Sequence, residues 1–244
     1  EPLTSDFTPP TGIASGPSER GPWANRLMSA RSSDGVTWEK TGQVISDQAD
    51  VPDLAILDGR VYLYYTGWTV GNEQNRTVVA VSDDDGETWV YKTLDLPDFE
   101  KNIKPVDPDI QILEDGTFRL YVTSDDRGGQ PNAGTYYTES TDGFSFEGRT
   151  VAFRQDGENA LDPNTILINE VWHYFAGGAP GGNWHATSDD GKTFDFYETN
   201  SFFANGSQYM MTNGIQFADG TYRYYAFANH EPDTVSFTTT NGSK

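Results

Sequence analysis

Acidic and amide side chains recur at four places along the chain, three of them beside proline. They stand in Val51-Pro52-Asp53, Val106-Asp107-Pro108-Asp109, Leu161-Asp162-Pro163-Asn164 and Met211-Thr212-Asn213-Gly214. Two carboxyl groups held close together can divide acid and base work, because repulsion and burial keep one of them protonated near neutral pH. Cleavage of a glycosidic bond needs such a pair, one to protonate the leaving oxygen and one to attack or to activate water. The same residues are also suited to capping turns or to holding a structural cation.

The elements that position these residues repeat with a period of about 50 residues, which matches one blade of a β-propeller. A serine, an aspartate, a glycine and an aromatic residue recur in order at 32–38, 82–89, 140–146 and 188–194, with a degraded copy at 239–243. The repeat predicts that Trp38, Trp89, Phe146 and Phe194 occupy equivalent positions, packed between the strands of successive blades.

A second turn lies between these copies and precedes a strand rich in tyrosine and β-branched residues. It reads Asp58-Gly59, Asp115-Gly116, Asn169-Glu170 and Asp219-Gly220. Such turns are strong signals for hairpins, and two hairpins per period give four strands. Short apolar runs before the turns predict buried inner strands near 53–57, 109–113, 164–168 and 213–218. The fold class expected is an all-β, five-bladed propeller of four-stranded antiparallel blades, with four blades as the alternative count.

The whole chain, 1–244, is expected to form one propeller domain. Its first 22 residues are rich in proline, glycine and serine and look like a loop. The blades are predicted at about 23–48, 51–97, 107–154, 162–204 and 210–244. The first blade is incomplete in sequence, so either residues 5–16 supply its inner strand or the two chain ends share one blade.

Because strands alternate in direction, the turns of both kinds should lie on one face and the starts of the inner strands on the other. Longer loops at 67–76, 124–134, 177–184 and 228–233 should share this second face. Together they offer flat aromatic rings and hydrogen-bonding groups suited to the faces and hydroxyls of a sugar. The residues predicted to bind substrate are Trp68, Arg127, Asn164, Trp184, His185, Asn213 and His230.

The charge balance narrows the range of partners. With 16 basic and 37 acidic residues the net charge is −21, which repels nucleic acid and anionic lipid. Cysteine is absent, and no apolar run approaches the roughly 20 residues that span a bilayer. We expect a carbohydrate partner, no membrane insertion and a monomer. The start at Glu1 rather than Met suggests a removed signal segment and a secreted or periplasmic protein.

No cofactor is required by this chemistry, and no transition-metal site is expected. Calcium in the central channel, held by oxygen ligands from Asp53, Asp109 or water, is the one ion that the sequence leaves open.

Two family resemblances follow from these motifs. The serine–aspartate repeats resemble the Asp-box hairpins of sialidase-type propellers. Inner strands that open with Asp-Pro and continue through an Asp-Gly turn into a tyrosine-rich strand resemble the five-bladed glycoside hydrolases of families 43, 32 and 68, over nearly the whole chain. The second resemblance implies hydrolysis of a poly- or oligosaccharide by water.

Enzymes of that kind carry three acidic residues on their inner strands. The resemblance gives Asp53 the role of base or nucleophile and gives Asp107 or Asp109 the role of orienting substrate or tuning a pKa. The third acid is a glutamate in those families, where this chain has Leu161-Asp162-Pro163, so Asp162 or Glu158 would serve. The alternative function is a non-catalytic propeller that binds a carbohydrate or a protein through the same face.

Overall fold

The computed structural model describes residues 3–18, 21–99, 104–125, 132–200, 202–204, 207–228 and 234–239. Apart from the short 3-10 turn η1 (Pro22–Ala24), the elements in these ranges are β-strands, and no helix among them has the length and apolar character needed to cross a membrane. The strands are β1 (Arg26–Arg31), β2 (Glu39–Asp47), β3 (Ala49–Leu57), β4 (Arg60–Val70), β5 (Glu73–Ser82), β6 (Val90–Thr93), β7 (Val106–Ile112), β8 (Phe118–Ser124), β9 (Gly134–Ser140), β10 (Glu147–Phe153), β11 (Leu161–Ile168), β12 (Val171–Ala179), β13 (Gly182–Ser188), β14 (Asp195–Asn200), β15 (Phe202–Ala204), β16 (Ser207–Gln216), β17 (Tyr222–Phe227) and β18 (Val235–Thr239).

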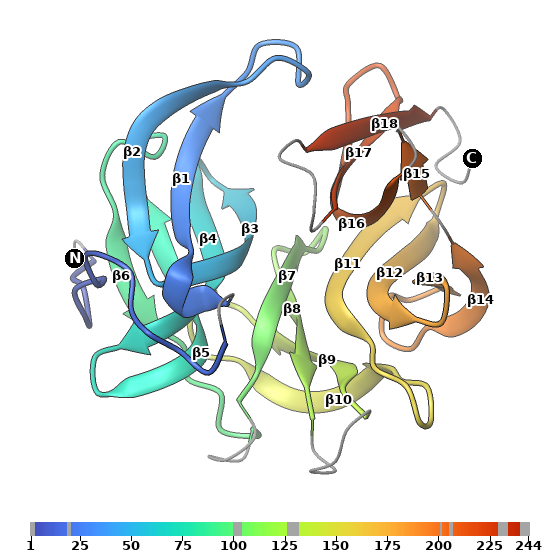
Figure 1. The fold of residues 1–244 in the computed structure, drawn as a ribbon, viewed down its shortest axis with the longest axis horizontal. Helices are drawn as coiled ribbons and strands as arrows, with labels where there is room; N and C mark the ends of the chain where they lie inside the picture. Colours follow the sequence, from blue (N-terminus) through green and yellow to red (C-terminus); the bar gives the residue numbers. More distant parts are fainter. Residues whose placement is uncertain are drawn as a thin grey trace. The chain divides into compact units, whose positions relative to one another are not determined.

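Sixteen of these strands form four antiparallel sheets of four consecutive strands each, as in the blades of a β-propeller (Figure 1). The sheets are β3–β6, β7–β10, β11–β14 and β15–β18, while β1 and β2 pair in a sheet of two. The all-β propeller class is therefore confirmed, and the count of five blades is corrected to the alternative of four.

The five-blade count is wrong because the predicted first blade lacks its inner half. Residues 23–48 supply only β1 and β2. Residues 5–16 do not form an inner strand: Asp6 N–H donates to Tyr91 O (2.8 Å) on β6, the outer strand of its sheet, and Gly12 N–H donates to Asp47 Oδ2 (2.6 Å) on β2. The degraded repeat copy at 239–243 lies outside the described residues beyond Thr239.

The chain divides into two compact units, and each is described by itself below. The first unit comprises Glu1–Leu120 and Thr138–Gly148, and the second comprises Tyr121–Tyr137 and Arg149–Lys244. A buried cluster around Leu63, Tyr65 and Val78 forms one core of the first unit. In the second unit Phe153, Tyr174 and Phe194 belong to a corresponding cluster.

Four serine–aspartate turns, at 32–38, 82–89, 140–146 and 188–194, share one hydrogen-bond pattern. In each, the serine hydroxyl donates to an aspartate Oδ1 at 2.7 to 3.0 Å and accepts the N–H of the turn glycine. Of the four aromatic residues that end these turns, Phe146 and Phe194 are buried, Trp89 is partly buried, and Trp38 is 50% exposed. Equal packing of all four was therefore too simple a prediction.

Two of these turns bind a tyrosine from an earlier sheet. In the first unit the Tyr64 hydroxyl on β4 donates to Gly143 O (2.7 Å), and in the second unit the Tyr121 hydroxyl on β8 donates to Gly191 O. Tyr64 and Tyr121 are both fully buried. This repeated bond satisfies a buried hydroxyl and fixes the turn against the strand that it covers.

Three inner strands, β3, β11 and β16, contain a bulge at the motif. Asp50 pairs with Thr66 and Asp53 with Tyr64, so Val51 and Pro52 face a single residue of β4. The same register shift separates Leu161 from Asn164, and the residue before proline has positive φ in three motifs: Val51 (46°), Asp107 (53°) and Asp162 (53°). A bulge re-aims the side chains that follow it, and here those side chains are the predicted site residues.

Candidate active site

Two candidate carboxylates of the first unit lie on the neighbouring inner strands β3 and β7. Asp53 is 9% exposed and Asp109 is 1% exposed. Ile110 N–H on β7 donates to Asp53 Oδ2 at 2.7 Å, which ties the carboxylate of one inner strand to the backbone of the next. A carboxylate that accepts a backbone N–H is fixed in orientation.

Threonine hydroxyls hold the bulges of two neighbouring motifs. Asp107 N–H donates to Thr66 Oγ1 (2.8 Å) in the first unit, and Asp162 N–H donates to Thr123 Oγ1 (3.2 Å) in the second. The left-handed residue at the bulge turns its N–H out of the strand ladder, and the threonine of the preceding sheet satisfies it. Sequence reasoning missed these threonines, although both occupy the same place in their strands, β4 and β8.

Asp162 has the electrostatic setting of an acid. Burial raises the pKa of the Asp162 carboxyl, because a charged carboxylate is poorly solvated at this position. Glu158 lies outside the strands, in the loop before β11, where its N–H donates to Gln155 O (3.3 Å). Asn164 is buried on β11 directly after its bulge, and Asn213 on β16 follows a smaller register shift.

The predicted substrate-binding aromatics differ in exposure. Trp68 is half-buried on β4 and packs edge-on against Trp23, with ring centroids 4.9 Å apart. Trp184 on β13 is buried in the core of the second unit, and its Nε1–H donates to Asn159 O (2.7 Å). Arg127 and His230 lie outside the described residues. The roles of all four in binding sugar stay predictions.

A buried histidine pair was not foreseen as a unit. His185 on β13 is 2% exposed and stacks on Phe175, with ring centroids 4.5 Å apart. Its Nε2 lies 2.9 Å from His173 Nδ1, and its Nδ1 lies 3.4 Å from a Glu198 carboxylate oxygen. These three residues come together through the pairing register of the strands, which no local motif indicates. The sequence therefore did not predict the pair. His185 stays a predicted substrate-binding residue, although its ring is enclosed.

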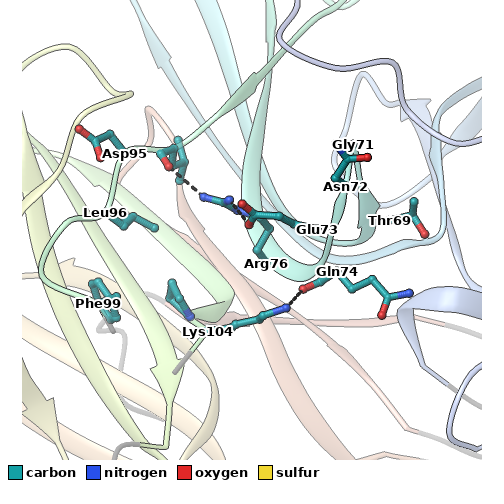
Figure 2. Close-up of a pocket in the computed structure, with 12 residues that line it drawn as sticks. Thr69, Gly71, Asn72, Glu73, Gln74, Arg76, Asp95, Leu96, Phe99 and Lys104 are labelled. Atoms are coloured by element: carbon teal, nitrogen blue, oxygen red, sulfur yellow. Dashed lines mark hydrogen bonds and ion pairs between the residues drawn. The ribbon is translucent and has the colours of Figure 1, made fainter. Parts of the chain in front are cut away.

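A pocket of about 780 Å³ lies beside the β4–β5 hairpin of the first unit. Figure 2 shows the polar side chains of the hairpin facing the chain segment that leads from β6 to β7. The pocket is at the end of β4 that is remote from the Asp58-Gly59 turn, and among the described residues neither a serine–aspartate turn nor a candidate carboxylate lines it. Its lining residues are Thr69, Gly71, Asn72, Glu73, Gln74, Arg76, Leu94, Asp95, Leu96, Phe99, Lys104 and Pro105.

Within the described ranges, no cluster of three or more histidine or acidic side chains has the arrangement to hold a metal ion. Calcium at Asp53 and Asp109 therefore stays a prediction from the sequence.

Comparison with known proteins places these features in a family. Residues 23–239 match the N-terminal domain of glycosyl hydrolases family 32. None of the curated proteins matches the chain in sequence.

Solved structures share the fold at low sequence identity. A thermostable family-43 glycoside hydrolase superposes with a TM-score of 0.67 at 16% identity, covering 83% of this chain and 77% of its own. The endo-arabinase from Bacteroides thetaiotaomicron VPI-5482 has a TM-score of 0.67 at 15% identity, with 88% and 85% covered. An N-acetylgalactosamine deacetylase from F. plautii, solved with blood group B trisaccharide, has a TM-score of 0.63 at 19% identity, with 89% and 73% covered.

The family match confirms the resemblance to family 32 and supports a glycosidase with a carbohydrate substrate. Because the match extends over most of the sequence, the chain belongs to the N-terminal domains of glycosyl hydrolases family 32.

Proposed function

We propose that this protein is a secreted or periplasmic glycoside hydrolase that cleaves a poly- or oligosaccharide with water, using the carboxyl groups of its inner strands. The observation that carries the proposal is the buried Asp53 carboxylate. It accepts the N–H of Ile110 on β7, the strand that also bears Asp109. An enclosed, oriented carboxylate on an inner strand suits proton transfer or nucleophilic attack better than a turn cap does.

Asp53 serves as the base or nucleophile in this proposal. The Ile110 N–H binds one carboxylate oxygen, Oδ2, and fixes the orientation that either role needs. Asp107 and Asp109 lie on the adjacent strand β7, where a second negative charge can orient substrate or tune a neighbouring pKa.

Asp162 serves as the proton donor. Its raised pKa keeps the carboxyl protonated to higher pH, which is the requirement for a general acid. Glu158 is the alternative donor, because it is the nearest glutamate before the third motif. Trp68, Asn164 and Asn213 are proposed to contact the sugar, together with Arg127, Trp184, His185 and His230.

The proposal is tested by incubating the purified chain with a panel of polysaccharides and measuring the release of reducing ends. The panel includes arabinan and xylan, since an endo-arabinase and an endo-1,4-β-xylanase are among the structural neighbours. Reducing-end release that is lost in Asp53→Asn supports the hydrolase. Binding without release by the unmodified chain contradicts it and favours the non-catalytic binding propeller.

The pH profile separates the two candidate donors. With Asp162 as the acid, the rate falls as the pH rises through the Asp162 pKa, and Asp162→Asn loses most activity while Glu158→Gln keeps it. A rate that depends on Glu158 and not on Asp162 assigns the donor role to the glutamate.

A further inference from the structure

We propose that the pocket beside the β4–β5 hairpin is an accessory binding site for a neutral saccharide chain, separate from the inner-strand carboxylates. The proposal rests on the proposed function only for the class of ligand. The volume of the pocket, about 780 Å³, falls within the range of small-molecule sites, about 300–1,000 Å³.

The pocket combines an apolar floor with a polar rim. Leu94, Phe99 and Pro105 are buried in its floor, whereas Asn72 and Gln74 are exposed at its edge. A sugar ring has the same two characters, with C–H groups on its faces and hydroxyls on its periphery. Polar groups placed around an apolar surface fix the orientation of a bound small molecule.

The charges of the pocket balance, which argues for a neutral ligand. Glu73 and Asp95 oppose Arg76 and Lys104. Arg76 is already paired with Glu73 and donates to Leu94 O (3.0 Å), and Lys104 Nζ donates to Gln74 O, as Figure 2 shows. An anionic ligand would have to compete for cations that are already engaged, in a chain whose net charge of −21 repels it.

Three rim side chains are available to hydroxyl groups. Within the part of the chain that the structure describes, the side chains of Asn72, Gln74 and Asp95 make no hydrogen bond to protein. Amide groups both donate and accept, and a carboxylate accepts, so the rim can bind adjacent sugar hydroxyls in either direction. Arg76 and Lys104 meanwhile fix the two walls against each other, so the site is largely formed before a ligand binds.

The pocket is close to the candidate carboxylates along the same two strands. Thr69 follows Thr66, whose hydroxyl accepts the Asp107 N–H, and Pro105 precedes Asp107 by two residues. Three residues of extended strand span roughly 10 Å. A polysaccharide held in the pocket is therefore retained near the proposed reaction centre. A polymeric substrate requires such retention, and a short substrate does not.

The test measures binding of arabinan, xylan and the anionic polygalacturonate to the Asp53→Asn variant. This substitution removes turnover but leaves the pocket intact. The double variant Asn72→Ala/Gln74→Ala, made in that background, should bind a neutral polymer at least about 10-fold more weakly, as expected for the loss of two hydrogen bonds. The matched control is Glu39→Ala/Lys40→Ala, also an exposed, charge-neutral double change, on β2. It should bind as the Asp53→Asn parent does.

A second measurement reports on the pocket directly. Methyl NMR of leucine-labelled protein should show the Leu96 resonance, identified with Leu96→Ile, shifting when the neutral polymer is added. Three outcomes would overturn the proposal. The first is an unchanged affinity of the double variant together with an unshifted Leu96 resonance. The others are binding of polygalacturonate alone and no binding to any polymer of the panel. Failure of the proposed function is seen separately, as absence of reducing-end release by the unmodified chain.

Discussion

His173 Nδ1 and His185 Nε2 lie 2.9 Å apart on adjacent strands inside the sheet β11–β14. A carboxylate only accepts hydrogen bonds, so the His185 Nδ1 that faces Glu198 is the donor there, at 3.4 Å. His185 Nε2 is then the acceptor, and His173 Nδ1–H donates to it. The pair is thus held in neutral tautomers by its neighbours.

The first prediction concerns the pH dependence of stability. Burial, and then the charge of His185, lower the pKa of His173 to about 4, and burial lowers that of His185 against the opposing effect of Glu198. The folded protein therefore binds fewer protons than the unfolded chain below pH 6.5. The free energy of unfolding should fall by about 1–3 kcal/mol as the pH drops from 6.5 to 4, and level off below pH 4.

Urea denaturation at half-unit pH steps measures this slope, and His173→Gln should flatten it. The aspartates of the serine–aspartate turns titrate in a separate window. Hydrogen bonds from Thr37 and Thr88 lower the pKa of Asp34 and Asp84 to about 2, so their stabilising effect is lost only below about pH 4. A stability that stays constant between pH 6.5 and 4.5 would contradict the depressed histidine pKa values.

The second prediction separates catalysis from stability at Asp53. Asp53→Asn keeps an oxygen acceptor for Ile110 N–H but removes the base, so reducing-end release should fall about a hundredfold or more while the melting temperature changes little. Asp58→Asn is the matched control: it makes the same change in the same sheet, at a turn position with φ of 52° that asparagine tolerates. It should keep full activity. Parallel loss of melting temperature and activity in Asp53→Asn would indicate a structural role instead.

The third prediction concerns the bond between Tyr64 and Gly143. Tyr64→Phe leaves a buried carbonyl without its donor and should lower the free energy of unfolding by about 1–3 kcal/mol. Tyr197→Phe removes the same hydroxyl from a side chain that is 64% exposed, and should change stability by less than about 0.5 kcal/mol. Equal stability of the two variants in denaturant melts would show that the turn does not depend on this bond.

The fourth prediction compares two aromatic residues at corresponding places in their turns. Phe146 is 1% exposed and packs edge-on against Tyr64, so Phe146→Ala should cost about 3–5 kcal/mol. Trp38→Ala should cost much less, since half of that side chain is already in water. Calorimetric melting of both variants measures the difference, and a larger effect at Trp38 would mean that β1 and β2 pack more deeply than the structure shows.

The hairpins could be predicted from the sequence because their signals are local. Gly59, Gly116 and Gly220 have φ near 80° to 85°, as the Asp-Gly turns require, and each turn is followed by the expected tyrosine-rich strand. The inner strand β3, however, begins at Ala49 rather than at Asp53. Proline usually ends a central strand, and only the bulge at Val51 and Pro52 lets the strand continue through it.

The rest depends on contacts between segments that are far apart in the sequence. Asp53 was identified by its motif, but its donor Ile110 lies on another sheet, and Thr66 and Thr123 carry no signal of their own. The missing half of the first blade was misjudged because a repeat copy at 32–38 identifies a hairpin and not the strands that should precede it. The pocket beside the β4–β5 hairpin was not predicted, because its second wall comes from Leu96, Phe99 and Lys104, which no local motif connects with the loop at 67–76.

The left-handed backbone at Val51 has a consequence for how this sequence can vary. A β-branched residue with φ of 46° directly before proline occupies a conformation that sterics disfavour, whereas the corresponding positions carry Asp107 and Asp162, which adopt it more readily. The side chain at position 51 is therefore poorly matched to a backbone that the neighbouring strands impose. When variants of a random library are selected for heat resistance, stabilising substitutions at position 51 should be among the first recovered. The mismatch there can be relieved without moving Asp53.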